Sequence, residues 1–218
     1  MAIADNTILL TTPDKRQVVF LEKSSGVIRG LLVDDAGVIV QASQLSALTL
    51  WLHLREDTTL PSGGINSVSN TNILNDGVRG VIGNSKTITG VTINSADDDF
   101  KGRIRLTIAT HGYSDGDVIG VRGVRGVRGA NGDWFVAVVD ANTIELIGST
   151  GGGVYTSGGT ATKGLHLQLQ PNDNAIVQSP APAIGATEWH EAYVLATFSG
   201  KQAPFLIHFQ VKNLGKAS

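Results

Sequence analysis

The sequence predicts an all-β protein in which one β-sandwich is interrupted by an inserted β module. Short apolar segments with a two-residue alternation recur along the 218 residues. Glycine is abundant, with 27 residues, whereas Lys, Glu and Met are sparse, a balance typical of many turns and short strands. The segments before residue 97 and after residue 164 have the same alternating pattern. The stretch between them consists of short β-patterned segments separated by Gly-rich turns and has no helical period.

Composition excludes several classes of function. With 41% hydrophobic and 17% charged residues the chain is expected to fold. A net charge of −2 provides no basic field for nucleic acid or an anionic membrane. The lack of cysteine excludes disulfides, thiolate metal sites and cysteine catalysis. We expect neither a signal peptide nor a membrane span, because no basic leader and no apolar run of about 20 residues is found.

The first strands are expected before residue 55. Residues 16–23, 27–33 and 38–41 are β-patterned, and the loop Asp34–Gly37 between the last two is a hairpin signal. In residues 44–55, leucines at 48, 50, 52 and 54 alternate with other residues, which places them on one buried face of a strand. A helix over residues 41–54 is the competing interpretation.

Residues 56–99 are polar and rich in turn formers, so we expect a long connection with a short helix near Asn70–Asn75 and one or two short strands. Strands return at residues 164–170, 188–198 and 203–214. Because these match residues 8–54 in character, we predict a discontinuous sandwich of residues 1–97 plus 164–218, with residues 98–163 inserted. Insertion at a surface loop is tolerated when the ends of the guest lie close together.

The repeat Val121–Gly129 reads Val-Arg-Gly three times. Collagen needs many more triplets and abundant proline. An RNA-binding stripe is disfavoured because arginines three residues apart on a strand would point to opposite faces, and no aromatic residues interleave for base stacking. A flexible loop between strands is therefore the expected structure, with no nucleic acid bound.

The segment His111–Asp117 includes His111, Ser114, Asp115 and Asp117, the side chains of a catalytic triad. Triads, however, are assembled from distant positions around a nucleophile on a strained turn. Adjacent residues in a Gly- and Asp-rich segment are better explained as a turn in which Asp side chains accept hydrogen bonds from backbone N–H groups.

Metal and acid–base sites are not predicted either. His53, His166, His190 and His208 form no H-x-H or H-x-x-x-H pair and are expected to face solvent or to be hydrogen-bonded packing groups, although cross-strand pairing leaves zinc open. Asp97–Asp99 and Asn172–Asn174 do not match a calcium loop. Glu188 and Glu191 fall on opposite faces of a strand, a poor arrangement for acid–base chemistry. The sequence thus predicts no catalytic, cofactor-binding or metal-binding residue and no enzyme.

The expected core anchors are aromatic: Trp51, Trp134, Trp189, Phe135, Phe198, Phe205 and Phe209.

Four segments between residues 110 and 161 together resemble a known β module. Residues 110–118 read THGYSDGDV, residues 130–136 ANGDWFV, residues 139–146 VDANTIEL and residues 158–161 GGTA. In this order and spacing they resemble a small β-barrel module found repeatedly in bacteriophage virion proteins, which is similar to the half-domain insert of ubiquitin-activating enzymes. The resemblance implies that residues 98–163 are an inserted small β-barrel without enzymatic activity.

The flanking segments are similar, more loosely, to an immunoglobulin-like sandwich at the N-terminus of phage neck, baseplate and head-fibre proteins. The two resemblances together imply a virion structural protein of the neck, the tail or baseplate, or the capsid surface, assembled in the bacterial host cytoplasm. Its partners would be other virion proteins and copies of itself.

The rival function is a carbohydrate-binding module for host-receptor recognition, which would need an exposed Trp51 or Trp189. A depolymerase is least favoured, because no suitably placed carboxylate pair is visible. The residues that carry the sandwich resemblance are 31–39, 48–54, 65–66, 169–173, 188–190 and 211–214.

Overall fold

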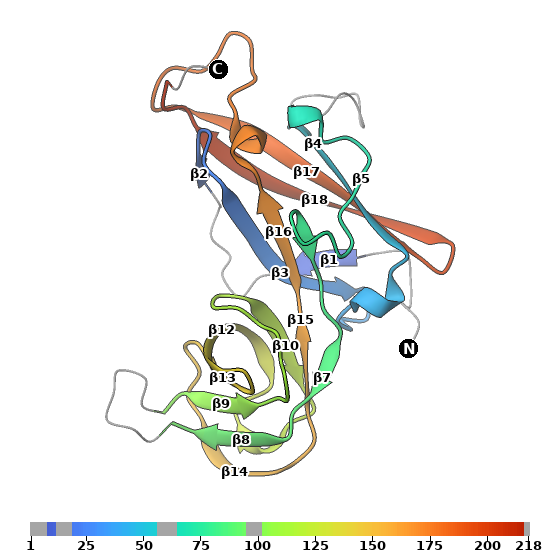
Figure 1. The fold of residues 1–218 in the computed structure, drawn as a ribbon, viewed down its shortest axis with the longest axis vertical. Coiled ribbons are helices and arrows are strands. Elements are labelled where there is room, and N and C mark those ends of the chain that lie inside the picture. Colours follow the sequence, from blue (N-terminus) through green and yellow to red (C-terminus); the bar gives the residue numbers. More distant parts are fainter. Residues whose placement is uncertain (1–7, 12–18, 56–64, 95–101, 216–218) are drawn as a thin grey trace.

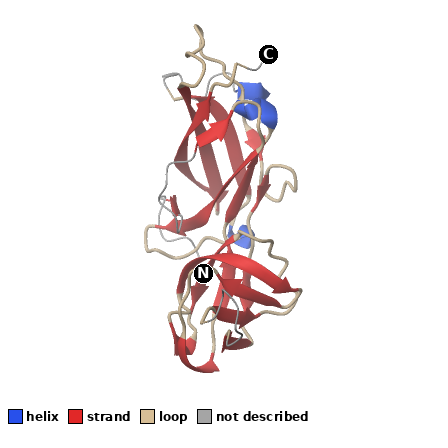
Figure 2. Cartoon of the chain, turned by 90° about the vertical axis from the view of Figure 1, so that its left-hand side faces the viewer, coloured by secondary structure: helices blue, strands red, loops and turns tan. Residues whose placement is uncertain are grey.

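The computed structural model describes residues 8–11, 19–55, 65–94 and 102–215. These residues form eighteen strands and three short 3₁₀ helices, so the predicted all-β class is confirmed. Figure 1 shows two β units along the long axis, and Figure 2 shows that strands dominate both. None of the helices in the described ranges is long and apolar enough to cross a membrane. The helices are η1 (Ala42–Gln44), η2 (Ile65–Ser67) and η3 (Pro171–Asn174).

The upper unit is a β-sandwich whose two sheets share one apolar core. Side chains from both sheets meet in this core, with Leu50, Leu167 and Phe209 fully buried. The five-stranded sheet has the order β2 (Val19–Leu21), β18 (Lys201–Lys212), β17 (Thr187–Phe198), β4 (Ala47–Leu54) and β5 (Thr71–Asn72). The four-stranded sheet has the order β1 (Ile8–Thr11), β3 (Gly26–Asp34), β16 (Leu165–Leu169) and β6 (Gly80–Val81).

The lower unit is a seven-stranded sheet that curls around a second core as a half-barrel (Figure 1). Ile104, Val136 and Leu146 are fully buried in this core. The sheet runs β7 (Ser85–Thr87), β15 (Thr160–Lys163), β10 (Val118–Arg122), β12 (Gly132–Asp140), β13 (Thr143–Leu146), β9 (Ile104–Thr107) and β8 (Gly90–Ile93). A two-stranded ribbon of β11 (Arg125–Arg128) and β14 (Gly152–Ser157) accompanies it.

The alternation in residues 47–54 forms the predicted strand β4, and the competing helix is wrong. Leu48, Leu50 and Leu52 are fully buried in the sandwich core. The longest hairpin, β17–β18, pairs twelve residues on each strand and turns at Ser199 and Gly200, both with positive φ. Two consecutive positive φ values suit a tight hairpin turn, whose twist matches that of the strands. This hairpin therefore also matches its prediction.

Three local expectations differ from the structure. Residues 38–41 form only one bridge, between Ile39 and Val33, because the chain then enters η1. No helix lies at Asn70–Asn75: positive φ values at both ends bracket the two-residue strand β5. Strands β7 and β8 belong to the seven-stranded sheet, so its pairing begins at Ser85 and not at residue 98. The aspartates 97–99 lie outside the described residues.

The Val-Arg-Gly repeat is not a loop but forms the end of β10 and all of β11. Val121, Val124 and Val127 are all buried, and the arginines that follow them are all exposed. The expectation that these arginines point to opposite faces is therefore wrong. The third residue of each triplet, glycine, has φ of +77°, +89° and +82°, which interrupts the two-residue alternation and gives every triplet the same orientation.

The two units are joined by two neighbouring chain segments and an apolar contact. Residues 82–84 and Gly164 connect the sheets, and the backbone N–H of Gly83 donates to the carbonyl of Lys163. Leu31 and Ile39 of the upper unit pack against Val118 of the lower unit. A Cβ atom on Gly120 would lie 2.1 Å from Ile39 Cδ1, so a larger residue there would displace the Ile39 side chain from this contact. The contact brings the start of β10 against β3.

Candidate functional site

His111 is a structural residue of its turn. Its Nε2 lies 2.7 Å from the Asp140 carbonyl, and its Nδ1 accepts a hydrogen bond from the Tyr113 backbone N–H at 2.9 Å. This pair of contacts fits a neutral imidazole protonated at Nε2. Because both nitrogens are used, His111 has none left to activate Ser114. The side chains suggestive of a triad are therefore not assembled into one.

Asp117 instead joins the two units. The carboxylate is 1% exposed, and its Oδ2 accepts hydrogen bonds from the Ser114 backbone N–H at 2.8 Å and from Lys163 Nζ at 2.7 Å. Its Oδ1 lies 3.3 Å from Nδ1 of His166 on β16. Burial alone would raise the pKa of the Asp117 carboxyl, but the bonds from Lys163, Ser114 and His166 hold the pKa below its ordinary value. The sequence predicted the backbone contact but not the partners on β15 and β16.

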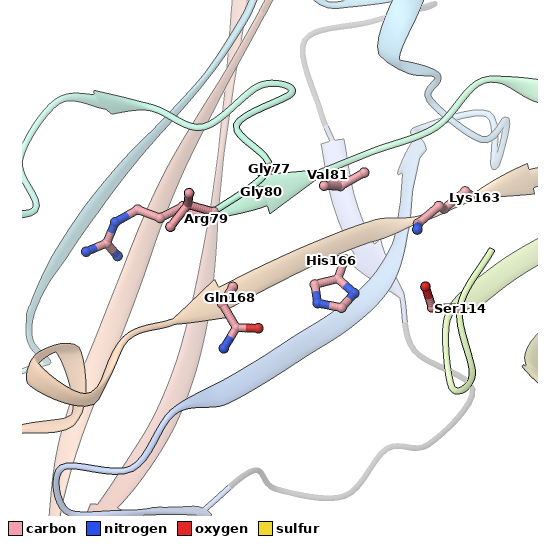
Figure 3. A pocket seen from close by; sticks show the side chains of 9 residues that line it. Gly77, Arg79, Gly80, Val81, Ser114, Lys163, His166 and Gln168 are labelled. Carbon is pink, nitrogen blue, oxygen red and sulfur yellow. The ribbon is translucent and has the colours of Figure 1, made fainter. Parts of the chain in front are cut away.

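A polar pocket of about 270 Å³ opens beside this ionic contact. It lies between the turn before β6, strand β16 and the loop that contains Ser114 (Figure 3). Ser114, Lys163 and His166 gather at one end, and Arg79 is directed away. The Arg79 guanidinium is bound to Asp173, with Nη1 2.7 Å from Oδ2, so its charge is already paired. The lining residues are Gly77, Val78, Arg79, Gly80, Val81, Ser114, Lys163, His166 and Gln168.

Arg29 adds a further positive charge next to the pocket. It is the register partner of His166 on β3, so both side chains lie on one face of the sheet. Its Nη1 lies 2.8 Å from the place that a Cβ atom on Gly116 would take. Its buried Nε has no hydrogen-bond partner among the described residues. Three basic side chains thus gather near the single carboxylate of Asp117.

Two further histidines, His53 and His208, lie close together on the outer face of the five-stranded sheet. Cross-strand pairing places Glu191 between His53 and His208. His53 Nε2 is 3.2 Å from Glu191 Oε1, and His208 Nε2 contacts Oε2. Within the described ranges, no group of three or more His, Cys, Asp or Glu residues could hold a metal ion. The two histidines are therefore paired through the carboxylate rather than arranged around a metal.

Glu188 faces the opposite side from Glu191, as the alternation predicts. Its Oε1 is 2.6 Å from Nε2 of the buried His190, and the backbone N–H groups of Val177 and Gln178 donate to its carboxylate at 3.0 and 2.8 Å. Burial acts to raise the pKa of the Glu188 carboxyl, but these hydrogen bonds bring the pKa below its ordinary value. Glu188 therefore holds the 175–186 loop against the sheet.

The outer face of the five-stranded sheet, formed by the side chains that point away from the sandwich core, carries exposed aliphatic side chains among polar ones. Val19 and Leu21 on β2 are 48% and 49% exposed, and Leu206 on β18 is 49% exposed. Tyr193 and Leu195 on β17 are half-buried next to Leu206. A solvated sheet face usually carries polar side chains, so this surface is suited to a protein contact.

The aromatic residues on this face are not free for sugar stacking. Trp51 is 8% exposed and packs edge-on against Tyr193, with ring centroids 5.4 Å apart. Trp189 is half-buried, and the Arg55 guanidinium covers its ring at 5.0 Å. Trp189 thus differs from the expected core anchors, because it lies at the surface beneath an arginine.

No protein-family model matches the sequence, and the search of curated proteins finds no match.

Proposed function

We propose that this chain is a structural component of a tailed bacteriophage virion, where it mediates protein–protein assembly. The resemblance of residues 110–161 to a virion barrel module supports this role, as does the looser resemblance of the flanking segments. The all-β architecture of two packed units suits a spacer or docking protein. The neck, the tail or baseplate and the capsid surface are the stations at which such a protein would act, and its partners would be other virion proteins and copies of itself.

The observation that carries the proposal is the set of exposed aliphatic side chains on the outer face of the five-stranded sheet. Val19, Leu21 and Leu206 are about half exposed there, and a partner would remove them from water. At about 25 cal/mol per Å² of apolar surface, covering such side chains supplies a substantial driving force for association. His208, which is held by the buried Glu191, adds an exposed polar group to this face.

The test introduces a negative charge on the outer face of the five-stranded sheet. Leu206→Asp is expected to prevent incorporation of the protein into particles, because the carboxylate would have to be buried in the contact. Val154→Asp is the matched control, since Val154 is 80% exposed on β14 of the other unit. Both variants are produced in place of the wild type in a phage-producing culture, and purified particles are examined by mass spectrometry. Equal incorporation of the two variants, or a wild-type protein missing from the particles, contradicts the proposal.

Carbohydrate binding is the rival function, and the tryptophans argue against it. Sugar recognition needs a free aromatic face, which neither Trp51 nor Trp189 offers. A glycan array with the isolated protein separates the two functions. A specific glycan signal that is lost in Trp189→Ala would favour receptor recognition over assembly.

A further inference from the structure

We propose that the pocket between β6, β16 and the Ser114 loop binds an oxyanion, the carboxylate or phosphate group of a ligand, through Lys163, His166 and Ser114. This inference is independent of the assembly role, since it rests on the donors that line the pocket.

The pocket presents hydrogen-bond donors that the protein does not use. An ammonium group has three N–H donors, and Lys163 gives one of them to Asp117. His166 contacts Asp117 through Nδ1, so its Nε2 has no other partner among the described residues and can donate to an anion when the ring carries both protons. Within the described part of the chain, the Ser114 hydroxyl has no hydrogen-bond partner, although its residue lines the pocket. Lys163, Ser114 and Nε2 of a protonated His166 therefore face one space from two stretches of chain, residues 163–166 and the Ser114 loop (Figure 3).

The charge balance around the pocket favours an anion. Asp117 is the carboxylate nearest to Lys163 and His166, and its two oxygens are already occupied by Lys163, His166 and the Ser114 backbone N–H. Because Asp117 is 1% exposed, it orients the donors without itself facing the ligand. Arg29 is the register partner of His166 on β3 and its Nε is unpaired within the described residues, so it adds positive potential to the same sheet face. A bound oxyanion would accept hydrogen bonds from the unused donors and balance the positive charge.

The size of the pocket limits the ligand. One water molecule occupies about 30 Å³ in the liquid, so about 270 Å³ holds a phosphate or a carboxylate with several waters. It lies below the range of about 300–1,000 Å³ typical of sites for drug-sized molecules. The ligand group is therefore a small anion or the acidic end of a polypeptide side chain.

Occupancy would also affect the junction of the two units. His166 belongs to β16 of the sandwich, whereas Lys163 and Ser114 belong to the half-barrel. An anion that contacts all three bridges the units at the point where Asp117 already does. Binding should therefore raise the stability of the junction along with that of the site.

The experiment is an NMR titration of the full chain with sodium phosphate and, separately, with sodium acetate, at constant ionic strength set by sodium chloride. The expected result is a saturable shift of the Ser114, Gly80 and Lys163 amide resonances with one of the two anions. The anion that binds identifies the ligand chemistry as phosphate or carboxylate. Shifts that never saturate, or that chloride alone reproduces, overturn the proposal.

Variants locate the binding. Lys163→Gln should weaken the affinity by at least about tenfold, because charge-assisted hydrogen bonds contribute about 1.5–3 kcal/mol. Lys201→Gln at the exposed β17–β18 turn is the charge-matched control and should bind as the wild type does. Since Lys163→Gln also leaves Asp117 without its ammonium partner, Ser114→Ala serves as the second variant. It should weaken binding several-fold at an unchanged melting temperature of the ligand-free protein. Equal affinities for Lys163→Gln, Ser114→Ala and Lys201→Gln refute the site.

Discussion

Replacing Asp117 by asparagine tests whether the buried ionic contact holds the two units together. Asparagine keeps the shape and one carbonyl acceptor for the Ser114 N–H, but it removes the negative charge from between Lys163 and His166. Those two side chains are only 13% and 24% exposed. Breaking a buried ion pair costs about 3–5 kcal/mol. Because His166 and Lys163 keep some access to water, the lower end of that range, about 3 kcal/mol, is the expected loss in the free energy of unfolding.

The assay is urea denaturation followed by far-UV circular dichroism, with Asp133→Asn as the matched control. Asp133 pairs with Arg122 at 2.7 Å, but both side chains are at least one-third exposed, so its loss should cost less than about 1 kcal/mol. If Asp117→Asn is no more destabilising than Asp133→Asn, the ionic contact does not stabilise the junction and this reasoning is refuted.

The same variant has a predicted pH dependence. The folded-state pKa of Asp117 is lowered, so the stabilisation is fully present above the unfolded-state value, about 3.9, and is lost as pH falls through the lower folded value. The difference in stability between the wild type and Asp117→Asn should therefore shrink on acidification from about pH 5 towards pH 3. A difference that grows on acidification would contradict the assignment of a charged, buried Asp117.

Two further predictions concern the loop and the contact between the units. Glu188→Ala removes both acceptor oxygens and should release the backbone N–H of Val177, so hydrogen exchange at that amide should speed up by at least about tenfold, and an unchanged rate would rule out Glu188 as the anchor of the loop. Gly120→Ala should lower the free energy of unfolding by about 1–3 kcal/mol, because the new Cβ would overlap Ile39. Gly77→Ala, where a Cβ meets nothing within 4 Å, is its control in the same urea assay, and equal effects of the two changes would refute the close contact.

Long alternating segments could be predicted from the sequence, because their burial follows from local chemistry. The leucines of β4 and the twelve-residue strands β17 and β18 lie where the two-residue period places them. Short strands could not be predicted in this way. Strands β7 and β8 have three and four residues in a polar stretch, and their pairing depends on β15 and β9, which are distant in sequence. The half-barrel therefore includes residues that the sequence assigned to the sandwich.

The pocket shows a different limit of sequence reasoning. Asp117 is a close neighbour of His111 in the sequence, yet the side chains that pair with it are Lys163 and His166, about fifty residues away. No spacing rule links these positions, because the link arises from the junction between the units. The prediction for the Val-Arg-Gly repeat is wrong for a local reason. The two-residue alternation assumes negative φ along the strand, whereas Gly123, Gly126 and Gly129 have positive φ.

The repeat has a consequence for how this protein can vary. Each triplet carries its own inward valine, outward arginine and resetting glycine, so the ribbon is modular in steps of three residues. A chain that gained or lost one whole triplet would keep an apolar inner edge and a basic outer edge. A gain of one or two residues would instead place arginine against the core. An insertion of nine nucleotides is therefore the smallest in-frame change of this segment that keeps valine inward and arginine outward.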